Sequence, residues 1–352
     1  MFHLRRRRTA TRGTRDEPPH SLEVSIGHVR YAARRSRRRD GLAIAGYELQ
    51  TLLGRGGVGE VYRATHRLLD RSVAIKLIRP EVVLSAADDD LFMTLRRFRR
   101  EARIAATLRS PHAVRIHDFG MTGGTFYIVM ELLDGMNLQH LVERFGPMPP
   151  ERAVHLLRQA CLALEEMHAA GVAHRDVKPA NLHVCRIGGR YDFVKLTDLG
   201  MVRPRHGTTA EHEALRARGE VLGTPAYIAP EMALGEPGDE RSDLYGLGCV
   251  GYWLLTGHLV FEAARPRDLV AQHVHTRPTP PSHRTELTVP SLLDNIVLDC
   301  LHKEPAHRPP SVRELRDRLD ACTFPRAWTQ ERARRWWDAH VPSDRLAAAG
   351  GE

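Results

Sequence analysis

Hydrophobic positions between Tyr47 and about Met130 are grouped in short runs rich in β-branched and aromatic residues. Such runs, separated by glycine and polar residues, are typical of strands. A longer segment, Asp88–Leu108, has acids at its start and arginines through its body, which is typical of a helix. The strands predicted from this pattern are Tyr47–Leu53, Gly59–His66, Ser72–Ile78, Val114–Phe119 and Thr125–Glu131.

From Pro150 onward the spacing of apolar residues becomes that of helices. Glu151–Ala170 carries apolar side chains at helical intervals, which predicts an amphipathic helix. Leu244–Phe261 is the most apolar stretch, but glycines and polar residues interrupt it, so we predict a buried core helix and not a membrane span. Between the two regions, Leu132–Asn137 is too short to be an element. The pattern therefore predicts an α+β protein with a small β-rich lobe, a connector and a larger helical lobe.

Charge is distributed unevenly along the 352 residues, whose formal net charge is +9. Residues 1–40 hold 12 arginines and only four acidic residues, whereas the rest of the chain is almost neutral. We therefore expect residues 1–42 to form a basic, disordered arm separate from the folded body. This arm is either a solvated tail, or the product of a start site placed too far upstream, or a segment that binds polyanions.

The five cysteines are scattered, and none belongs to a C-x-x-C pair. This pattern argues against a disulfide scaffold or a structural zinc site, and it predicts a reducing compartment, the cytoplasm. The N-terminus is charged but lacks an apolar core, which argues against a secretory signal. No transmembrane segment is expected.

Lysine is rare in this chain, with four lysines against 48 arginines. A lysine kept in such a background suggests a role that requires a compact point charge. Lys76 ends an apolar strand near a glycine-rich segment, Leu53–Val61, which matches G-x-G-x-x-G-x-V. Glycines there let the backbone approach phosphates, although a plain glycine-rich hairpin fits the segment as well. Because the segment lies between two predicted strands, a dinucleotide-binding fold is disfavoured.

A second group of chemically active residues follows the long predicted helix. The segment His174–Asn181 places an acid (Asp176), a lysine (Lys178) and an amide (Asn181) within one short loop. The carboxylate can accept a hydroxyl proton, the lysine can neutralise phosphate oxygens, and the amide oxygen can bind Mg²⁺. Asp198, after two further strand-like runs, supplies a second oxygen ligand for the metal.

In this order, the segments resemble the eukaryotic-like (Hanks-type) serine/threonine protein kinases, of the soluble bacterial type. The resemblance covers about residues 47–320. The motifs that carry it are the glycine-rich loop, V-A-I-K, the helix residue Glu101, H-R-D-x-K-P-x-N, D-L-G, G-T-P-A-Y-I-A-P-E and D-x-x-x-x-G. It implies a bilobal protein kinase fold over residues 43–322, with an N-lobe over about 43–130 and a C-lobe over about 135–322.

The resemblance also implies an activity and the residues that perform it. The activity is transfer of the ATP γ-phosphoryl group to protein Ser/Thr hydroxyls, with autophosphorylation, in signalling. Asp176 would deprotonate the substrate hydroxyl and Lys178 would steady the transferred group. Asn181 and Asp198 would hold Mg²⁺, with Mn²⁺ as an alternative.

A wider set of residues is implied in binding ATP. Lys76 would contact the α- and β-phosphates and pair with Glu101, while the Glu131 carbonyl and the Leu133 amide would bind adenine. The whole set is Leu53, Gly54, Arg55, Gly56, Gly57, Val58, Gly59, Val61, Ala74, Lys76, Glu101, Met130, Glu131, Leu133 and His183.

Two residues depart from the family near the nucleotide. Leu199 replaces the usual Phe of D-F-G and is still apolar. His183 lies where the family usually has an aliphatic floor for adenine. A neutral imidazole can stack on adenine, so the ordinary histidine pKa predicts that ATP affinity weakens below about pH 6.5.

The resemblance places the protein substrate on a platform that includes Thr224. It also predicts a buried structural ion pair between Glu231 and Arg308. Thr208 and Thr209 are the candidate phosphorylation sites between Gly200 and Gly223. Either they are autophosphorylated and bound by Arg175, or a carboxylate at Glu211, Glu213 or Glu220 occupies Arg175 without modification.

Three other functions compete with protein phosphorylation. A pseudokinase scaffold would lack a catalytic or metal-binding residue, and none is missing. Small-molecule phosphotransferases of related fold generally lack the G-T-x-x-Y-x-A-P-E segment. A nucleic-acid-binding protein is suggested only by the arm. Residues 323–352 form a Trp-containing extension in which Trp328 and Trp336 can share one helix face, as a helix docked on the large lobe or as a partner-binding helix.

Overall fold

The computed structural model describes residues 23–26, 29–32, 43–56, 59–78, 103, 105–122, 125–198 and 225–341. Met1–Arg39 and Asp40–Glu352 are two separate units. In the first unit, β1 (Glu23–Ile26) pairs antiparallel with β2 (Val29–Ala32), a hairpin that the charge pattern did not predict.

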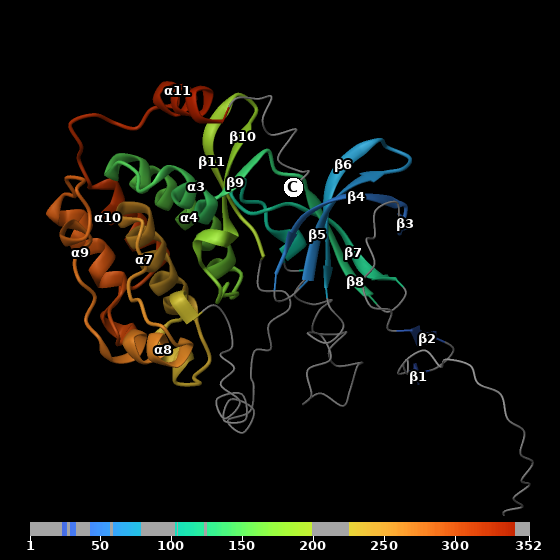
Figure 1. Cartoon of the computed structure of the whole chain (residues 1–352), viewed down its shortest axis with the longest axis horizontal. Helices are drawn as coiled ribbons and strands as arrows, with labels where there is room; N and C mark the ends of the chain where they lie inside the picture. The colour runs from blue at the N-terminus through green and yellow to red at the C-terminus, as the bar shows by residue number, and fades with distance from the viewer. Residues whose placement is uncertain are drawn as a thin grey trace, which may run out of the picture. The chain divides into compact units, whose positions relative to one another are not determined.

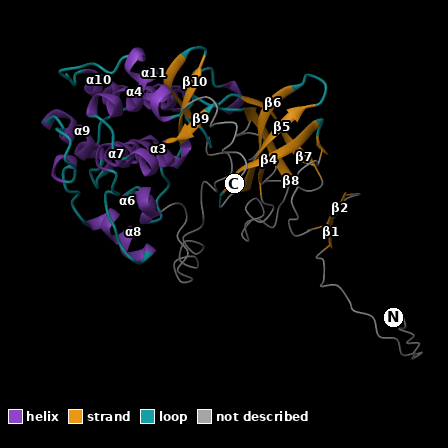
Figure 2. Ribbon diagram, turned by 45° about the horizontal axis from the view of Figure 1, so that its top comes forward, coloured by secondary structure: helices purple, strands orange, loops and turns teal. Residues whose placement is uncertain are grey.

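The second unit begins with a six-stranded antiparallel sheet in the order β3-β4-β5-β6-β8-β7 (Figures 1 and 2). The five strands predicted from the sequence are present in it, and β5 and β8 have the predicted bounds. The inner strand β6 is buried from its third residue to its last, which suits its apolar composition. The strands are β3 (Ala43–Ile44), β4 (Tyr47–Arg55), β5 (Gly59–His66), β6 (Arg71–Ile78), β7 (Ile116–Thr122) and β8 (Thr125–Glu131).

The helix predicted over Asp88–Leu108 lies mostly outside the described residues. Residues 105–107 near its end are helical, and Ala105 is buried in the core.

A second, three-stranded sheet follows the connector, in the order β11-β10-β9. It contains β9 (Gly135–Asn137), β10 (Leu182–Ile187) and β11 (Arg190–Leu196). The prediction that Leu132–Asn137 forms no element was therefore wrong. Gly135 permits the strand, because a Cβ on this residue would lie 2.0 Å from the Val184 carbonyl oxygen of β10.

The remaining described residues of the second unit are mainly helical, as predicted from the spacing of apolar residues. The α-helices are α3 (Leu138–Phe145), α4 (Pro150–Ala169), α6 (Pro230–Ala233), α7 (Glu240–Thr256), α8 (Pro266–His275), α9 (Ser291–Cys300), α10 (Val312–Asp320) and α11 (Gln330–His340). Short 3₁₀ turns are η1 (Pro179–Asn181), η2 (Pro225–Tyr227), η3 (Pro281–His283) and η4 (Pro305–His307). In the described part of the chain, no helix combines the length and the apolar character needed to cross a bilayer.

Helix α7 is the predicted core helix and is buried along nearly its whole length. Asp239 and Ser242 form a capping box at its start, and Gly257 ends it at a φ of +70°. Inside the helix, Gly246 packs against the loop that follows α4, since a Cβ there would lie 2.7 Å from the Val177 carbonyl oxygen. The glycine thus sets how closely α7 approaches the loop that contains Asp176.

This close approach predicts that Gly246→Ala destabilises the protein. Alanine improves helix propensity by about 1 kcal/mol, but overpacking against rigid backbone costs about 1–3 kcal/mol. We expect a net loss of about 1 kcal/mol in the free energy of unfolding, measured with urea. Gly251→Ala is the matched control, because its added Cβ meets side-chain carbons at 3.3 Å that can shift. A Gly246→Ala protein at least as stable as wild type would contradict the packing role.

Candidate active site

Two predicted site residues that lie far apart in the sequence meet between the two lobes. Lys76 is on β6 and is 8% exposed, because the strand on either side of it is buried. Its Nζ lies 2.5 Å from Oδ1 of Asp198, two residues after β11. The residue predicted to contact phosphate, Lys76, and the residue predicted to bind the metal, Asp198, therefore lie side by side.

Asp198 has unusual backbone and electrostatic surroundings. Its φ is +57°, a left-handed conformation that costs a non-glycine residue about 1 kcal/mol or more. Burial raises the pKa of its carboxyl group, but the charge and hydrogen bond of Lys76 outweigh this effect, with smaller help from His174 and Lys178. The net result is a pKa below the ordinary value, so the carboxylate stays ionised and able to bind a cation.

The loop between α4 and β10 brings together the other three predicted catalytic and metal residues. Lys178 Nζ lies 3.0 Å from Oδ2 of Asp176. The Asn181 amide nitrogen donates to the backbone oxygen and to Oδ2 of Asp176, at 2.8 and 3.1 Å. Because the nitrogen of Asn181 is committed to Asp176, its amide oxygen is the atom left to bind a metal ion.

A buried carboxylate that the sequence analysis gave no role holds this loop in place. Asp243 of α7 is fully buried and accepts hydrogen bonds from the backbone amides of His174 and Arg175, at 2.8 and 2.6 Å. His168 Nε2 also lies 2.8 Å from it. Arg175 has a φ of +60°, so the loop turns sharply just before Asp176. The D-x-x-x-x-G motif at Asp243 was the available signal, but only the fold shows what the carboxylate contacts.

The glycines of the predicted phosphate-binding loop occupy two different physical settings. A Cβ on Gly59 would lie 2.0 Å from the Leu77 carbonyl oxygen of β6, so this glycine is required by strand packing. A Cβ on Gly54 or Gly56 would meet none of the described residues within 4 Å. Packing within this part of the chain therefore does not require these two glycines, and the space beside them suits the close approach of a phosphate.

The described residues expected around adenine lie on β5, β6, β8 and β10 and in the connector, Leu132–Asp134, that follows β8. Ala74 of β6 is directly opposite Met130 of β8 in the sheet register. The side chain of Glu131 pairs with Lys195 Nζ at 2.6 Å. Contact of the Glu131 carbonyl with adenine stays a prediction of the resemblance.

The pKa of His183 is far from the value assumed in the sequence analysis. Burial lowers it to about 4, against a smaller opposite effect of Asp198. Its Nδ1 is buried and has no hydrogen-bond partner among the described residues. A change of ATP affinity near pH 6.5 through this ring was therefore the wrong expectation, because the imidazole stays neutral down to about pH 4.

Several expected residues lie outside the described part of the chain. Glu101, the expected partner of Lys76, is among them, so that pair stays a prediction. The others are Gly57, Val58, Leu199, Thr208, Thr209, Glu211, Glu213, Glu220 and Thr224.

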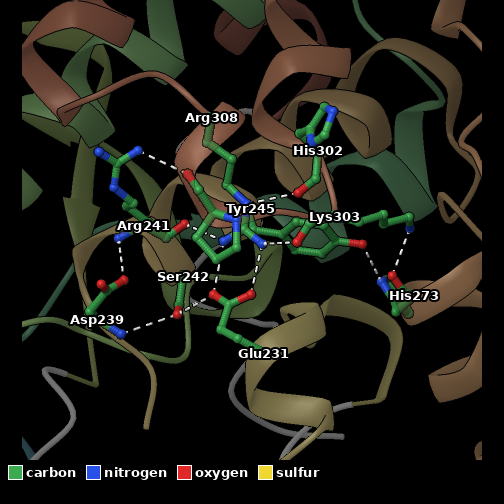
Figure 3. Close-up of polar contacts among 10 residues, drawn as sticks. Glu231, Asp239, Arg241, Ser242, Tyr245, His273, His302, Lys303 and Arg308 are labelled. Carbon is green, nitrogen blue, oxygen red and sulfur yellow. Dashed lines mark hydrogen bonds and ion pairs between the residues drawn. The ribbon is translucent and has the colours of Figure 1, made fainter. Parts of the chain in front are cut away.

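A buried ion pair joins α6 to the segment after α9 (Figure 3). Arg308 donates through Nη1 and Nη2 to the two carboxylate oxygens of Glu231, at 2.8 and 2.7 Å. Ser242 Oγ donates to the same carboxylate at 2.6 Å. Burial raises the pKa of Glu231, but the hydrogen bonds and charge of Arg308 hold it below its ordinary value. The predicted pair is confirmed.

Comparison with known proteins agrees with this geometry. Residues 47–318 match the model of the protein kinase domain family. The chain is 40% identical over 274 residues to serine/threonine-protein kinase PknB of Mycobacterium leprae, covering 77% of this chain and 42% of that protein. It is 36% identical over 277 residues to serine/threonine-protein kinase pkn3 of Myxococcus xanthus, covering 78% of this chain and 49% of that one. The chain thus spans less than half the length of these relatives.

A solved structure shows the same fold. The Mycobacterium tuberculosis PknI kinase domain superimposes with a TM-score of 0.59 and 28% sequence identity, over 80% of this chain and 97% of that one.

The buried pair predicts that Arg308→Ala strongly destabilises the protein. The substitution leaves the Glu231 carboxylate buried without its cation, which costs about 3–5 kcal/mol. Urea unfolding should show this loss, whereas Arg313→Ala, which removes a cation that is 70% exposed, should cost less than about 1 kcal/mol. Equal losses in the two variants would contradict the structural role of the pair.

The lowered pKa of His183 predicts a specific acid sensitivity. The ring binds its proton near pH 6.5 when unfolded but only near pH 4 when folded. Stability is therefore complete above pH 6.5 and is lost as the pH falls toward 4. Between pH 7 and pH 5, wild type should lose about 2 kcal/mol more than His183→Leu in urea unfolding. Parallel losses would show that His183 titrates normally.

Proposed function

The chain belongs to the protein kinase family, and we propose that it is a serine/threonine protein kinase that transfers the ATP γ-phosphoryl group to hydroxyl groups of protein substrates. The observation that carries the proposal is the convergence of Lys76 and Asp198 beside the loop of Asp176, Lys178 and Asn181. The five residues come from both lobes, and each has the chemical type that phosphoryl transfer requires.

The family implies ATP and a divalent metal, and the described residues fit both. Asp198 and Asn181 offer one carboxylate and one amide oxygen, a set that Mg²⁺ accepts when substrate phosphates complete its coordination, and Mn²⁺ shares this preference. When bound, the metal would neutralise charge on the phosphate oxygens. The fixed cation of Lys76 and the open space beside Gly54 and Gly56 support phosphate binding.

In the proposed reaction, Asp176 orients the acceptor hydroxyl and takes its proton. Lys178, 3.0 Å from the Asp176 carboxylate, is placed to neutralise charge on the transferred phosphoryl group. Asn181 donates to the same carboxylate and thereby fixes its orientation. Because catalysis of this kind is mostly positioning and electrostatic stabilisation, the rigid loop matters as much as the side chains on it.

The acceptor is proposed to be a protein Ser or Thr. The names of the relatives support this class, and so does the buried Glu231–Arg308 pair that the resemblance implies. Thr224 belongs to the proposed platform. Autophosphorylation at Thr208 and Thr209, and the alternative that a carboxylate occupies Arg175, both stay predictions.

The compartment, partners and domain bounds are also proposals. All five cysteines are free thiols, which fits a reducing compartment such as the cytoplasm. Contact of the basic arm with a polyanion stays a proposal based on its charge. We place the kinase domain over residues 43–322, followed by the Trp-containing extension.

The proposal predicts that Asp176→Asn and Lys76→Met each reduce phosphoryl transfer at least about 10²-fold, because one removes the proton acceptor and the other the phosphate contact. The assay follows radiolabel from [γ-³²P]ATP into a generic protein substrate. Asp338→Asn, an exposed carboxylate, is the matched control and should keep full activity. Full activity in purified Asp176→Asn would contradict the assignment of Asp176 as the residue that accepts the proton in a protein kinase.

A further inference from the structure

The described segment that follows the family match belongs to the second unit. Residues 323–341, here named the C-terminal clamp, come after residue 318, where the match to the kinase domain ends. Its helix α11 packs against β11, in the position seen in Figure 1. Trp337 is fully buried, as the docked-helix interpretation requires. Trp328, however, precedes α11, so the prediction that it shares a helix face with Trp336 was wrong.

The clamp supplies the remaining hydrogen bonds to a buried carboxylate. Asp192 of β11 is fully buried and has a φ of +51°. Arg152 of α4 donates to both of its oxygens, Nε to Oδ2 at 2.8 Å and Nη2 to Oδ1 at 2.9 Å. The clamp adds two indole donors, Trp337 Nε1 to Oδ1 at 2.7 Å and Trp328 Nε1 to Oδ2 at 2.9 Å. Each carboxylate oxygen thus accepts one bond from Arg152 and one from the clamp.

The partner cation is enclosed by the same segment. The guanidinium carbon of Arg152 lies 3.8 Å from the ring centre of Trp336 and 5.1 Å from that of Trp328. Because a buried ion pair is stable only when its remaining hydrogen-bonding capacity is satisfied, the clamp is required for this pair to stay buried. The clamp therefore stabilises the packing of hairpin β10–β11 against helix α4.

Hairpin β10–β11 is in turn attached to the connector beside the adenine site. Arg186 of β10 pairs with both carboxylate oxygens of Asp134 at 3.1 Å, and its backbone amide donates to the Asp134 carbonyl. The Arg186 guanidinium also lies 5.6 Å from the ring centre of Trp337. A second attachment joins Lys195 of β11 to Glu131. A continuous series of contacts thus runs from the clamp to Glu131, the last residue of β8, and to Asp134, so it reaches both ends of the connector, Leu132–Asp134.

We propose that Asp192, Trp328 and Trp337 are positioning residues for ATP binding. The clamp fixes the hairpin, the hairpin holds the connector through two ion pairs, and the connector presents its backbone to adenine. The inference rests on the proposed function, since it concerns the nucleotide of that reaction. The kinase unit that binds ATP with full affinity therefore extends to residue 341, beyond the family match.

The test measures ATP affinity directly in the full 352-residue chain, by isothermal titration calorimetry with Mg²⁺ present. Trp337→Phe keeps most of the ring but removes the hydrogen bond to Asp192, and it should raise the Kd roughly three- to tenfold. Its kcat at saturating ATP should stay within about twofold of wild type, because the reacting groups are unchanged. Trp253→Phe is the matched control, since its indole nitrogen has no partner among the described residues.

A second variant separates positioning from stability. Arg186→Met leaves all the hydrogen bonds to Asp192 in place; it removes the ion pair with Asp134 and the contact of the guanidinium with the Trp337 ring, so it should raise the Kd roughly two- to fivefold. Arg190→Met, an exposed arginine of the same hairpin, is its control.

The outcomes distinguish this inference from the proposed function. If Trp337→Phe or Arg186→Met binds ATP as tightly as its control, the positioning role is overturned, whatever happens to the melting temperature, and the proposed function stands. If the wild-type chain binds no ATP, the proposed function is overturned and the inference with it.

Discussion

The site depends first on one buried carboxylate, Asp243 of α7. Irregular backbone inside a protein must find partners for its amide groups, because an unpaired buried N–H costs about as much as a lost hydrogen bond. Asp243 accepts hydrogen bonds from the two amides that precede Asp176. Gly246, nearly one turn further along the helix, lets α7 approach the residue that follows Asp176. The helix thus fixes the loop on both sides of the proposed base, and the loop positions Lys178 and Asn181.

The second constraint is electrostatic, and it acts across the two lobes. Lys76 and Asp198 are brought together by different sheets, and the cation of Lys76 stabilises the charge of the Asp198 carboxylate. Their arrangement depends on the placement of β11, which ends two residues before Asp198. That strand is held at Asp192 by α4 and by the C-terminal clamp.

Much of this architecture can be predicted from the sequence, because strands and helices have distinct hydrophobic periods and the motifs have fixed spacing. The rarity of lysine was also informative: Lys178 lies in the catalytic loop, Lys195 pairs with Glu131, and Lys303 donates to the His273 carbonyl at 2.6 Å. Three features could not be predicted. The strand at Gly135 depends on a close approach to β10, the low pKa of His183 depends on burial, and the two tryptophan partners of Asp192 lie more than 100 residues away in the chain. All three depend on tertiary contacts that no local pattern encodes.

The most direct test of the account is the fate of the ATP γ-phosphoryl group. Purified protein, ATP, Mg²⁺ and a protein acceptor are incubated together, ADP is quantified, and mass spectrometry locates the phosphate on the products. The account predicts phosphoserine or phosphothreonine in an amount equal to the ADP formed, with the reaction abolished by a chelator and restored by Mg²⁺. ADP released with inorganic phosphate and no phosphorylated protein would contradict it, and so would the absence of turnover.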